Sequence, residues 1–330
     1  MKDLAKKAVL RSGLLGIAGR LRGPSAAILM YHSVMEDPRS QDVFLGEIVH
    51  SRDVFRGQME LLARRYHPVS LDDILQFAKG ELELPPRSVA VTFDDGYVDN
   101  YQIAAPILKQ VGVPATFYAT VDCLERRTLP WPSHLRFMVR TTKKGSGVDS
   151  AGRIWPLGSA VERENALLRF CDECCKLAGE AQEEYVQRLA NELDTHVPVD
   201  SGALMMDYVQ LRSLLGQGHS VGSHTLTHPN VAYLDMEASH RELAESKHRL
   251  EQALKSPIPH FSYPCPALSP SWTEQTVAES RKAGYETAVT TNGGLVRKGD
   301  DPLELRRIRP TKTVQGLWWN LECGFAGRLV

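Results

Sequence analysis

The sequence predicts an α/β fold, either a parallel β/α barrel or a doubly wound parallel sheet. Short apolar runs rich in Val, Ile, Leu and Phe recur along the chain and rarely alternate with polar residues, as in strands buried on both faces. Amphipathic segments separate these runs, and several of them stop at a glycine. In both candidate folds the active site lies at the carboxyl ends of the strands.

The predicted elements alternate regularly over most of the chain. Strands are expected at residues 26–31, 89–93, 115–120, 220–223, 261–263, 287–290 and 307–309. Helices are expected at residues 54–65, 71–79, 100–111, 208–215, 236–254 and 272–283. Strand–helix alternation of this kind is typical of a parallel sheet covered by helices.

One long region interrupts the alternation. Between about residues 124 and 207 no core strand is evident, Trp131, Trp155 and residues 143–147 suggest loops, and residues 162–177 and 181–193 have amphipathic helical patterns. We interpret this region as a helical insertion and a candidate lid. The expected organisation is therefore a basic N-terminal helix (1–25), a first barrel part (26–123), the insertion (124–207) and a second barrel part (208–330).

Composition narrows the function only by exclusion. The chain has 330 residues and a formal net charge of −1, so nothing in its charge favours nucleic-acid binding. Its six cysteines are irregularly spaced and do not indicate a disulfide framework. The apolar part of the basic N-terminal segment, residues 14–18, is too short to span a bilayer. We expect a cytoplasmic protein; the segment is either a surface helix packed on the barrel or a peripheral contact with the inner membrane.

Two polar clusters carry the chemistry. Asp94-Asp95-Gly96 ends one predicted strand, and His224-Thr225-Leu226-Thr227-His228 ends another. Two imidazoles and one carboxylate can bind a divalent ion, and the second carboxylate is then free to act as a base. Gly96 would permit the turn that brings both carboxylates to one site. The alternatives are an Asp-Asp-Gly turn without metal and a histidine pair that serves as a cap or in the core.

Three stretches resemble one known family. Residues 92–97 (Thr-Phe-Asp-Asp-Gly-Tyr), 114–117 (Pro-Ala-Thr-Phe) and 222–229 (Gly-Ser-His-Thr-Leu-Thr-His-Pro) are similar to motifs of polysaccharide deacetylases with a NodB-type domain, carbohydrate esterase family 4. The resemblance covers residues 26–123 and 205–310. It implies an irregular (β/α)7-type barrel and metal-dependent removal of N-acetyl groups, most commonly with Zn²⁺. It also implies Asp95, His224 and His228 as metal ligands and Asp94 as the general base.

The general acid is not where the family usually has it. The family places a histidine after a strand near the C-terminus, whereas no histidine follows His260 in this chain. His32 follows an apolar run near the N-terminus, and the first and last strands of a closed barrel are neighbours. The order therefore resembles that of permuted exopolysaccharide deacetylases, with His32 as the expected acid. The alternative is a core histidine paired with a backbone carbonyl.

A third family motif, Arg-x-Pro-Tyr-Gly, is altered. The corresponding residues 261–266 lack the arginine and the glycine, and Arg307 is the candidate to orient the base instead, the alternative being a surface salt bridge. Tyr97, Tyr263 and Pro264 are expected to line the substrate groove. Trp131 is the best candidate among the tryptophans to stack on a sugar, although packing is the default for any one of them.

The cysteine cluster Cys171-x-x-Cys174-Cys175 has no second pair at zinc spacing, so we expect buried or idle thiols rather than metal ligands.

Taken together, the residues predict a metal-dependent hydrolase that removes N-acetyl groups from an amino sugar in a polysaccharide or a glycoconjugate, which includes lipid-linked sugars. Two alternatives remain: a deformylase or other C–N hydrolase acting on a modified sugar, and a carbohydrate-binding relative that has lost catalysis.

Overall fold

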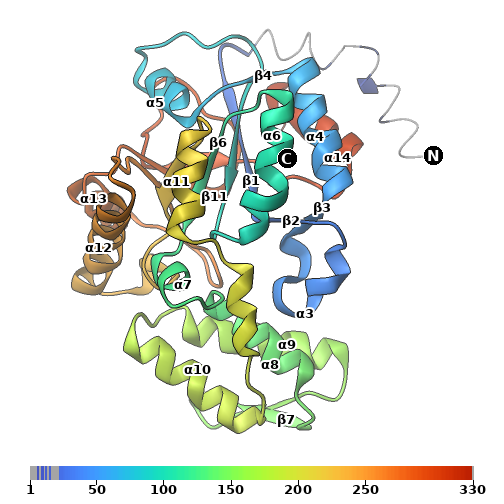
Figure 1. The fold of residues 1–330 in the computed structure, drawn as a ribbon, viewed down its shortest axis with the longest axis vertical. Coiled ribbons are helices and arrows are strands. Elements are labelled where there is room, and N and C mark those ends of the chain that lie inside the picture. The colour runs from blue at the N-terminus through green and yellow to red at the C-terminus, as the bar shows by residue number, and fades with distance from the viewer. Residues whose placement is uncertain (1–5, 7–8, 11, 13–14, 16–21, 329–330) are drawn as a thin grey trace.

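The computed structural model describes residues 6, 9–10, 12, 15 and 22–328. Seven parallel strands in this part of the chain form one curved sheet in the order β1-β5-β6-β9-β10-β11-β12. Figure 1 labels β1, β6 and β11 of this sheet. Their bounds are β1 Ala26–Tyr31, β5 Ser88–Phe93, β6 Ala115–Ala119, β9 Ser220–Ser223, β10 His260–Ser262, β11 Thr287–Gly293 and β12 Leu305–Arg307. The short strand β4 (His67–Pro68) also pairs with β5.

The first and last strands nearly close the sheet into a barrel. Leu29 and Ile308 form a parallel bridge, with backbone hydrogen bonds from Ile308 N to Ile28 O (2.7 Å) and from Met30 N to Ile308 O (3.1 Å). The α/β class and the (β/α)7-type barrel are thus confirmed, as is the expectation that the first and last strands are neighbours.

Helices surround the sheet. Those of the barrel are α4 Arg52–Arg65, α5 Leu71–Lys79, α6 Ala105–Val111, α7 Val121–Glu125, α11 Tyr208–Gly216, α12 Met236–Leu254, α13 Glu274–Lys282 and α14 Val314–Phe325. A π-helical turn, Asn100–Ala104, leads into α6. Side-chain caps fix several starts: the Ser70 and Asp207 side chains accept hydrogen bonds from the third residue of α5 and α11.

The sequence prediction missed some elements that depend on tertiary contacts. Helix α14 begins after the capping residue Thr313, and its Leu317 and Leu321 pack into the main core, which is an apolar spacing that the prediction could have used. The short parallel pair β2 (Ser33–Met35) and β3 (Val49–Ser51) is too short to leave a pattern in the sequence.

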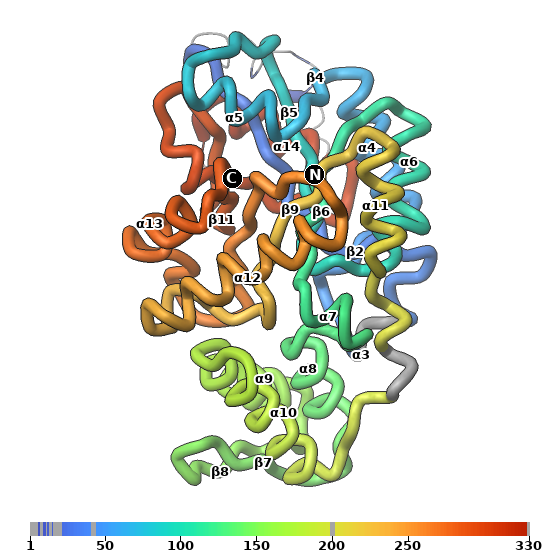
Figure 2. The backbone as a smooth tube through the Cα atoms, turned by 60° about the vertical axis from the view of Figure 1, so that its left-hand side comes forward, coloured from blue at the N-terminus to red at the C-terminus, as the bar shows by residue number. Residues whose placement is uncertain are grey.

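The insertion has a hydrophobic core of its own. Helices α8 Trp131–Thr141, α9 Ala160–Cys174 and α10 Glu180–Leu193 pack together with the antiparallel pair β7 Ser146–Val148 and β8 Ile154–Pro156. Figures 1 and 2 show this unit at one end of the molecule, below the barrel. Trp131 starts a helix rather than a loop, which corrects the expectation from the sequence. Short connecting helices flank the unit: η1 Pro38–Gln41, α3 Asp42–Leu45, η2 Gly46–Ile48, η4 Val199–Leu204 and η5 Val231–Tyr233.

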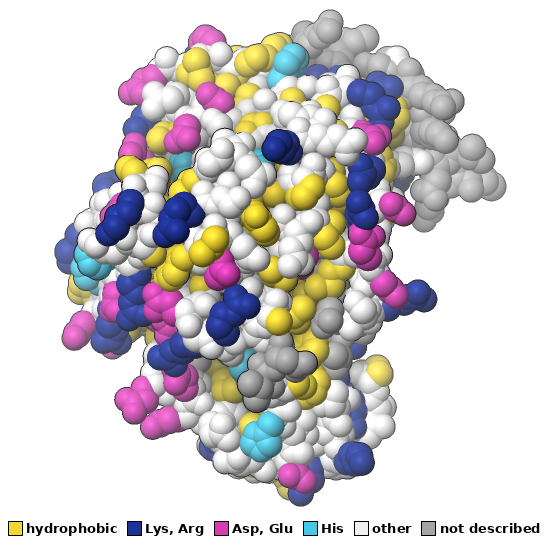
Figure 3. All heavy atoms as spheres, viewed as in Figure 1, with side chains coloured by type: hydrophobic (Ala, Val, Ile, Leu, Met, Phe, Trp, Pro, Cys, Tyr) yellow, Lys and Arg dark blue, Asp and Glu magenta, His cyan; other side chains and the backbone are white. Residues whose placement is uncertain are grey.

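Two surface findings bear on the sequence expectations. Lys and Arg side chains are interspersed with Asp and Glu over the face shown in Figure 3. None of the helices in the described ranges combines the length and apolar composition that crossing a bilayer requires. The expected basic helix at residues 1–25 falls largely outside the described residues.

Candidate metal centre

The turn after β5 brings both carboxylates to the mouth of the barrel. Asp94 N donates to Tyr31 O (2.9 Å), which extends the β1–β5 pairing by one residue. The chain then turns at Asp95, whose φ of 75° lies in the left-handed region, and at Gly96, whose φ is 90°. Both carboxylates consequently line the same cavity, which has a volume of about 210 Å³. A non-glycine residue in this conformation costs on the order of 1–2 kcal/mol, and such strain is concentrated at functional sites.

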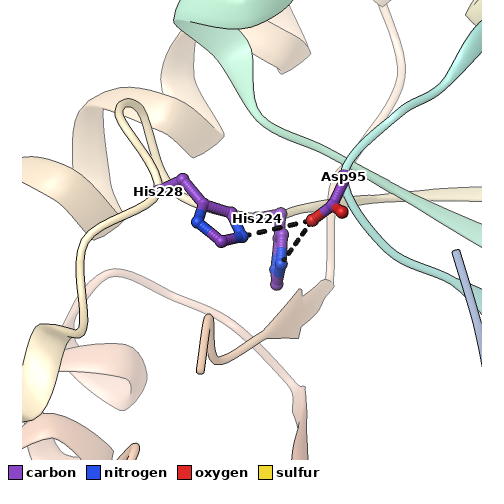
Figure 4. A group of neighbouring side chains, drawn as sticks. All are labelled: Asp95, His224 and His228. Atoms are coloured by element: carbon purple, nitrogen blue, oxygen red, sulfur yellow. Dashed lines mark ion pairs between the residues drawn. The ribbon is translucent and has the colours of Figure 1, made fainter. Parts of the chain in front are cut away.

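Three donor atoms converge on one point. His224 Nε2 lies 3.4 Å and His228 Nε2 3.2 Å from Asp95 Oδ1, and the donor atoms of the three residues lie within 4.8 Å of one another (Figure 4). Two ligand atoms that each lie about 2.1 Å from one ion are separated by roughly the distances found here between the histidine nitrogens and Asp95 Oδ1. Asp95 Oδ1 is buried and accepts no hydrogen bond from the described residues. A divalent cation fits this donor set.

The imidazole of His224 is oriented from behind. Its Nδ1 lies 2.7 Å from Ser262 O, at the end of β10, and this hydrogen bond leaves Nε2 directed at Asp95. A backbone partner on the far ring nitrogen is the usual way in which proteins fix a metal-binding imidazole. The altered third motif therefore still serves the site through its backbone.

A buried carboxylate shapes the loop between the two histidines. Glu242 on α12 accepts hydrogen bonds from Leu226 N (2.9 Å), Thr227 N (3.0 Å) and Thr227 Oγ1 (2.7 Å). Thr225 and His228 both have positive φ, 67° and 64°. The prediction from the sequence missed Glu242, because an acidic residue within a mostly polar helix gives no sign that it is buried.

Asp94 forms a bidentate ion pair with Arg307. The two guanidinium nitrogens lie 2.8 Å from the two carboxylate oxygens, and both side chains are buried. Burial disfavours the ionised carboxyl group, but the Arg307 guanidinium outweighs it and holds the pKa of Asp94 below its usual value. Further hydrogen bonds join Arg307 to Thr290 O (2.9 Å) and Ser262 Oγ (3.2 Å). The candidate arginine thus lies on the candidate base and not in a surface salt bridge.

His32 also lies close to Asp94. Its Nε2 is 4.0 Å from Asp94 Oδ2, and the side chain is 22% exposed toward the cavity. Burial lowers the pKa of the imidazole from its usual value, and the carboxylates of Asp95 and Asp94 partly oppose this effect. The structure therefore places His32 beside the Asp95–His224–His228 cluster.

The backbone of His32 is held by a second polar group that the sequence did not reveal. Asn100 Nδ2 donates to His32 O (2.7 Å) and to Asp99 Oδ1 (2.9 Å). Asp99 in turn accepts hydrogen bonds from Ser33 Oγ (2.6 Å) and Val34 N (2.8 Å). Burial raises the pKa of Asp99 to about 7 despite these hydrogen bonds. Asp99 and Asn100 thus fix the segment that follows β1.

The structure places some of the expected substrate-binding residues on the cavity wall and others away from it. Tyr97 and Tyr263 line the cavity, although both are buried and the Tyr263 hydroxyl bonds to Ser280 and Leu303 in the core. The cavity wall beyond Tyr263 is formed by Cys265 and Pro266 rather than by the buried Pro264.

Trp131 lies behind the site and not on the cavity wall. Its ring is 5% exposed in the insertion core, and its Nε1 donates to His228 O (2.9 Å). This position corrects the expected stacking on a sugar, because a ring packed on all sides has no face to offer. Cys171, Cys174 and Cys175 are buried free thiols in the same core, and burial raises the pKa of each.

Comparison with known proteins agrees with this geometry. The polysaccharide deacetylase family model matches residues 81–142 and 189–288, which include both ligand motifs. YxkH of Bacillus subtilis strain 168, assigned to the polysaccharide deacetylases, is 22% identical over 230 residues, or 70% of this chain and 54% of YxkH. The chain therefore spans about half the length of that relative.

Solved structures share the fold at low sequence identity. The Streptococcus pyogenes deacetylase PplD in complex with acetate has a TM-score of 0.60 at 19% identity, covering 89% of this chain and 96% of that one. IcaB from Ammonifex degensii has a TM-score of 0.59 at 18% identity, covering 91% and 97%. The barrel has this topology, and the matched regions contain both ligand motifs, whose donors the fold brings together. The chain therefore belongs to the polysaccharide deacetylase family.

Proposed function

We propose that the protein is a metal-dependent deacetylase that hydrolyses the N-acetyl group of an amino sugar, with Zn²⁺ as its metal. One observation carries the proposal: the Asp95–His224–His228 donors, the Asp94–Arg307 pair and His32 all line or adjoin one cavity. When bound, the ion supplies Lewis-acid polarisation of the acyl carbonyl and of the attacking water.

The base and the acid adjoin the same cavity, with His32 Nε2 4.0 Å from Asp94 Oδ2. Asp94 is ionised and held by Arg307, so its carboxylate is positioned to take the proton of the attacking water. His32 delivers a proton to the amine nitrogen as the C–N bond breaks, because an amine is a poor leaving group unless it is protonated. The backbone contact between Asn100 and His32 keeps that imidazole in the cavity.

The test combines metal analysis with acetate release. The wild-type protein should contain one equivalent of Zn²⁺ and release acetate from N-acetylglucosamine derivatives, and a chelator should abolish that release. His224→Ala and His228→Ala should lose both the metal and the activity. His67→Ala is a matched control, because the His67 side chain is exposed, lies outside the cavity lining and has its Nδ1 2.8 Å from Pro86 O.

Asp94→Asn separates the base from the ligands. It should keep the metal and lose turnover by at least ~100-fold. Stoichiometric metal in the His224→Ala/His228→Ala double variant would refute the assignment of the ligands. A metal-loaded protein that binds the sugars but releases no acetate would make it a carbohydrate-binding relative instead.

A further inference from the structure

The cavity changes character as it extends from the metal donors toward the insertion. The wall on that side combines aliphatic and polar side chains. The aliphatic ones are Leu45, Ile48, Pro130, Pro132, Leu167 and Leu168, and α8 and α9 add Ser133, Arg136, Glu164 and Cys171. Sugar hydroxyls buried against the aliphatic side chains would lose hydrogen bonds to water without gaining others. The aliphatic side chains of this wall therefore suit a hydrocarbon, and its polar side chains suit a charged group.

The aromatic rings of the cavity do not change this conclusion. Tyr97 and Tyr263 are each less than 2% exposed, so neither offers a free face. Phe44 stacks on Phe137 of α8 with ring centroids 4.9 Å apart and an interplanar angle of 12°, which occupies one of its faces.

Two exposed apolar side chains of α9, which together we call the stripe, continue outward from this wall, with Glu164 and Asn165 on the same helical face between them. Leu168 lines the cavity and is 56% exposed, and Val161, one heptad earlier on the same helical face, is 71% exposed. The two residues are separated by about 10 Å along the helix axis. Exposed large apolar side chains that adjoin a cavity mark a binding surface, since water solvates them poorly.

Two arginines line the same cavity. Arg136 of α8 is half-buried and Arg309, after β12, is exposed; in the part of the chain that the structure describes, neither has an ion-pair partner. Glu164 on the same wall is paired with Arg140 at 3.9 Å, so its charge is already offset. Free guanidinium groups are suited to bind a phosphate.

We propose that this end of the cavity binds the phosphate-linked hydrocarbon group of a glycolipid, so that the amino sugar reaches the metal centre while attached through phosphate to a lipid chain. The proposal rests on the proposed deacetylase function and names its substrate class. The cavity supplies both features that such a group requires: cationic side chains for the phosphate and an apolar path for the chain. Leu168 joins the stripe to the reaction cavity, because it lines the cavity and is exposed.

The first experiment compares four substrates on the Zn²⁺-loaded protein. They are N-acetylglucosamine 1-(decyl phosphate), N-acetylglucosamine 1-phosphate, decyl N-acetylglucosaminide and the N-acetylglucosamine tetramer. The decyl phosphodiester should have a kcat/KM at least ~10-fold above each of the others, mainly through a lower KM, because only it fills both parts of the subsite.

Variants then test each part. Val161→Ser/Leu168→Ser should raise the KM for the decyl phosphodiester by ~10-fold, and that for N-acetylglucosamine 1-phosphate by much less. Val209→Ser on α11, where Val209 is 69% exposed, is the matched control and should change neither KM.

Arg136→Gln/Arg309→Gln should reduce the advantage of the decyl phosphodiester over decyl N-acetylglucosaminide to nearly one. Arg306→Gln, an exposed arginine of the neighbouring strand β12, is the control and should leave that advantage intact.

The outcomes separate the two proposals. If no substrate releases acetate in a chelator-sensitive reaction, the deacetylase function itself is overturned. If acetate is released equally from all four substrates, or faster from the tetramer, only the lipid subsite is overturned. If Val161→Ser/Leu168→Ser weakens binding to substrate-free phosphatidylglycerol vesicles and leaves every KM unchanged, the stripe is a membrane contact and the subsite is again overturned.

Discussion

The barrel and the insertion contribute to the same cavity in different ways. The barrel supplies the candidate metal ligands and the candidate base and acid, held by buried hydrogen bonds, as Arg307 holds Asp94 and Glu242 holds the His224–His228 loop. It also adds apolar side chains such as Met30 and Leu45. The insertion contributes side chains from α8 and α9, which pack on a separate core: the aliphatic Pro132, Leu167 and Leu168 beside Ser133, Arg136, Glu164 and Cys171. Because the candidate ligands, base and acid all come from the barrel, we propose that the insertion acts on substrate selectivity. Barrel variants should therefore damage the reaction, metal binding or folding, and insertion variants should do so only weakly.

The largest effect is expected at His32. His32→Ala should retain its metal and lose N-acetyl hydrolysis by ~10²–10⁴-fold, because the leaving amine is no longer protonated. Hydrolysis of 4-nitrophenyl acetate should be retained, since nitrophenolate leaves without a proton. Asp94→Asn is the matched comparison and should lose both activities. Equal losses on the amide and the ester in His32→Ala would contradict a role as the acid.

The next effect concerns the buried ion pair. Arg307→Met should lower the free energy of unfolding by about 3–5 kcal/mol, because the Asp94 carboxylate would be left buried without its counter-ion. Arg306→Met, at the adjacent exposed position, should change it by less than ~0.5 kcal/mol. Urea denaturation of the metal-free proteins measures both. Similar values for the two variants would mean that Asp94 is protonated or hydrated in the folded state.

A pH-dependent effect is expected at Asp99. Its pKa is raised to about 7 in the folded protein, so the folded state binds a proton that the unfolded state has released between pH 4 and pH 7. The contribution of Asp99 to stability therefore falls as pH rises through this window, by ~1.4 kcal/mol per unit. Asp99→Asn removes this slope, and its stability relative to wild type should rise by on the order of 2–3 kcal/mol from pH 5 to pH 8. A constant difference between the two proteins over that range would exclude the raised pKa.

A smaller effect is expected behind the metal loop. Glu242→Gln should weaken Zn²⁺ binding by ~10–100-fold, because the amide group presents a donor where Leu226 N and Thr227 N require an acceptor. Glu245→Gln, a partly exposed position on the same helix, should leave the affinity unchanged. Competition with a chromogenic chelator gives the affinities. Unchanged binding in Glu242→Gln would show that the loop keeps its shape without this carboxylate.

The smallest effect tests the boundary between the two regions. Trp131→Phe keeps an aromatic ring in the insertion core but removes the hydrogen bond to His228 O, at a cost of about 1 kcal/mol. Trp155→Phe removes a similar bond to Asp149 Oδ2 (3.1 Å) that lies wholly within the insertion. Only Trp131→Phe should also reduce metal affinity, by a few-fold. A reduction as large as that of Glu242→Gln would mean that the insertion helps to build the metal centre.

The sequence predicted the features that depend on local patterns and missed those that depend on tertiary contacts. The strands and the ligand motifs were predictable because each is local: an apolar run, or side chains within five residues of one another. His32 needed the additional argument that a closed barrel joins its ends, and Arg307 was a candidate only because the altered third motif lacks its arginine. Asp99, Asn100 and Glu242 were not predictable, because polar residues in or beside helices look alike in sequence whether they face water or a buried loop. The place of Trp131 also depended on tertiary packing that its neighbours in the sequence do not reveal.

Closure of the barrel by β1 and β12 has a consequence for synthesis of the chain. Asp94 and its partner Arg307 are separated by 213 positions, so a ribosome adding 5–20 residues per second completes Arg307 roughly 10–40 s after Asp94. During that interval Asp94 has no guanidinium beside it, and burying it would be unfavourable. The nascent barrel should therefore stay open and hydrated at this end until its last strand arrives, which delays formation of the catalytic pocket until most of the polypeptide has been made.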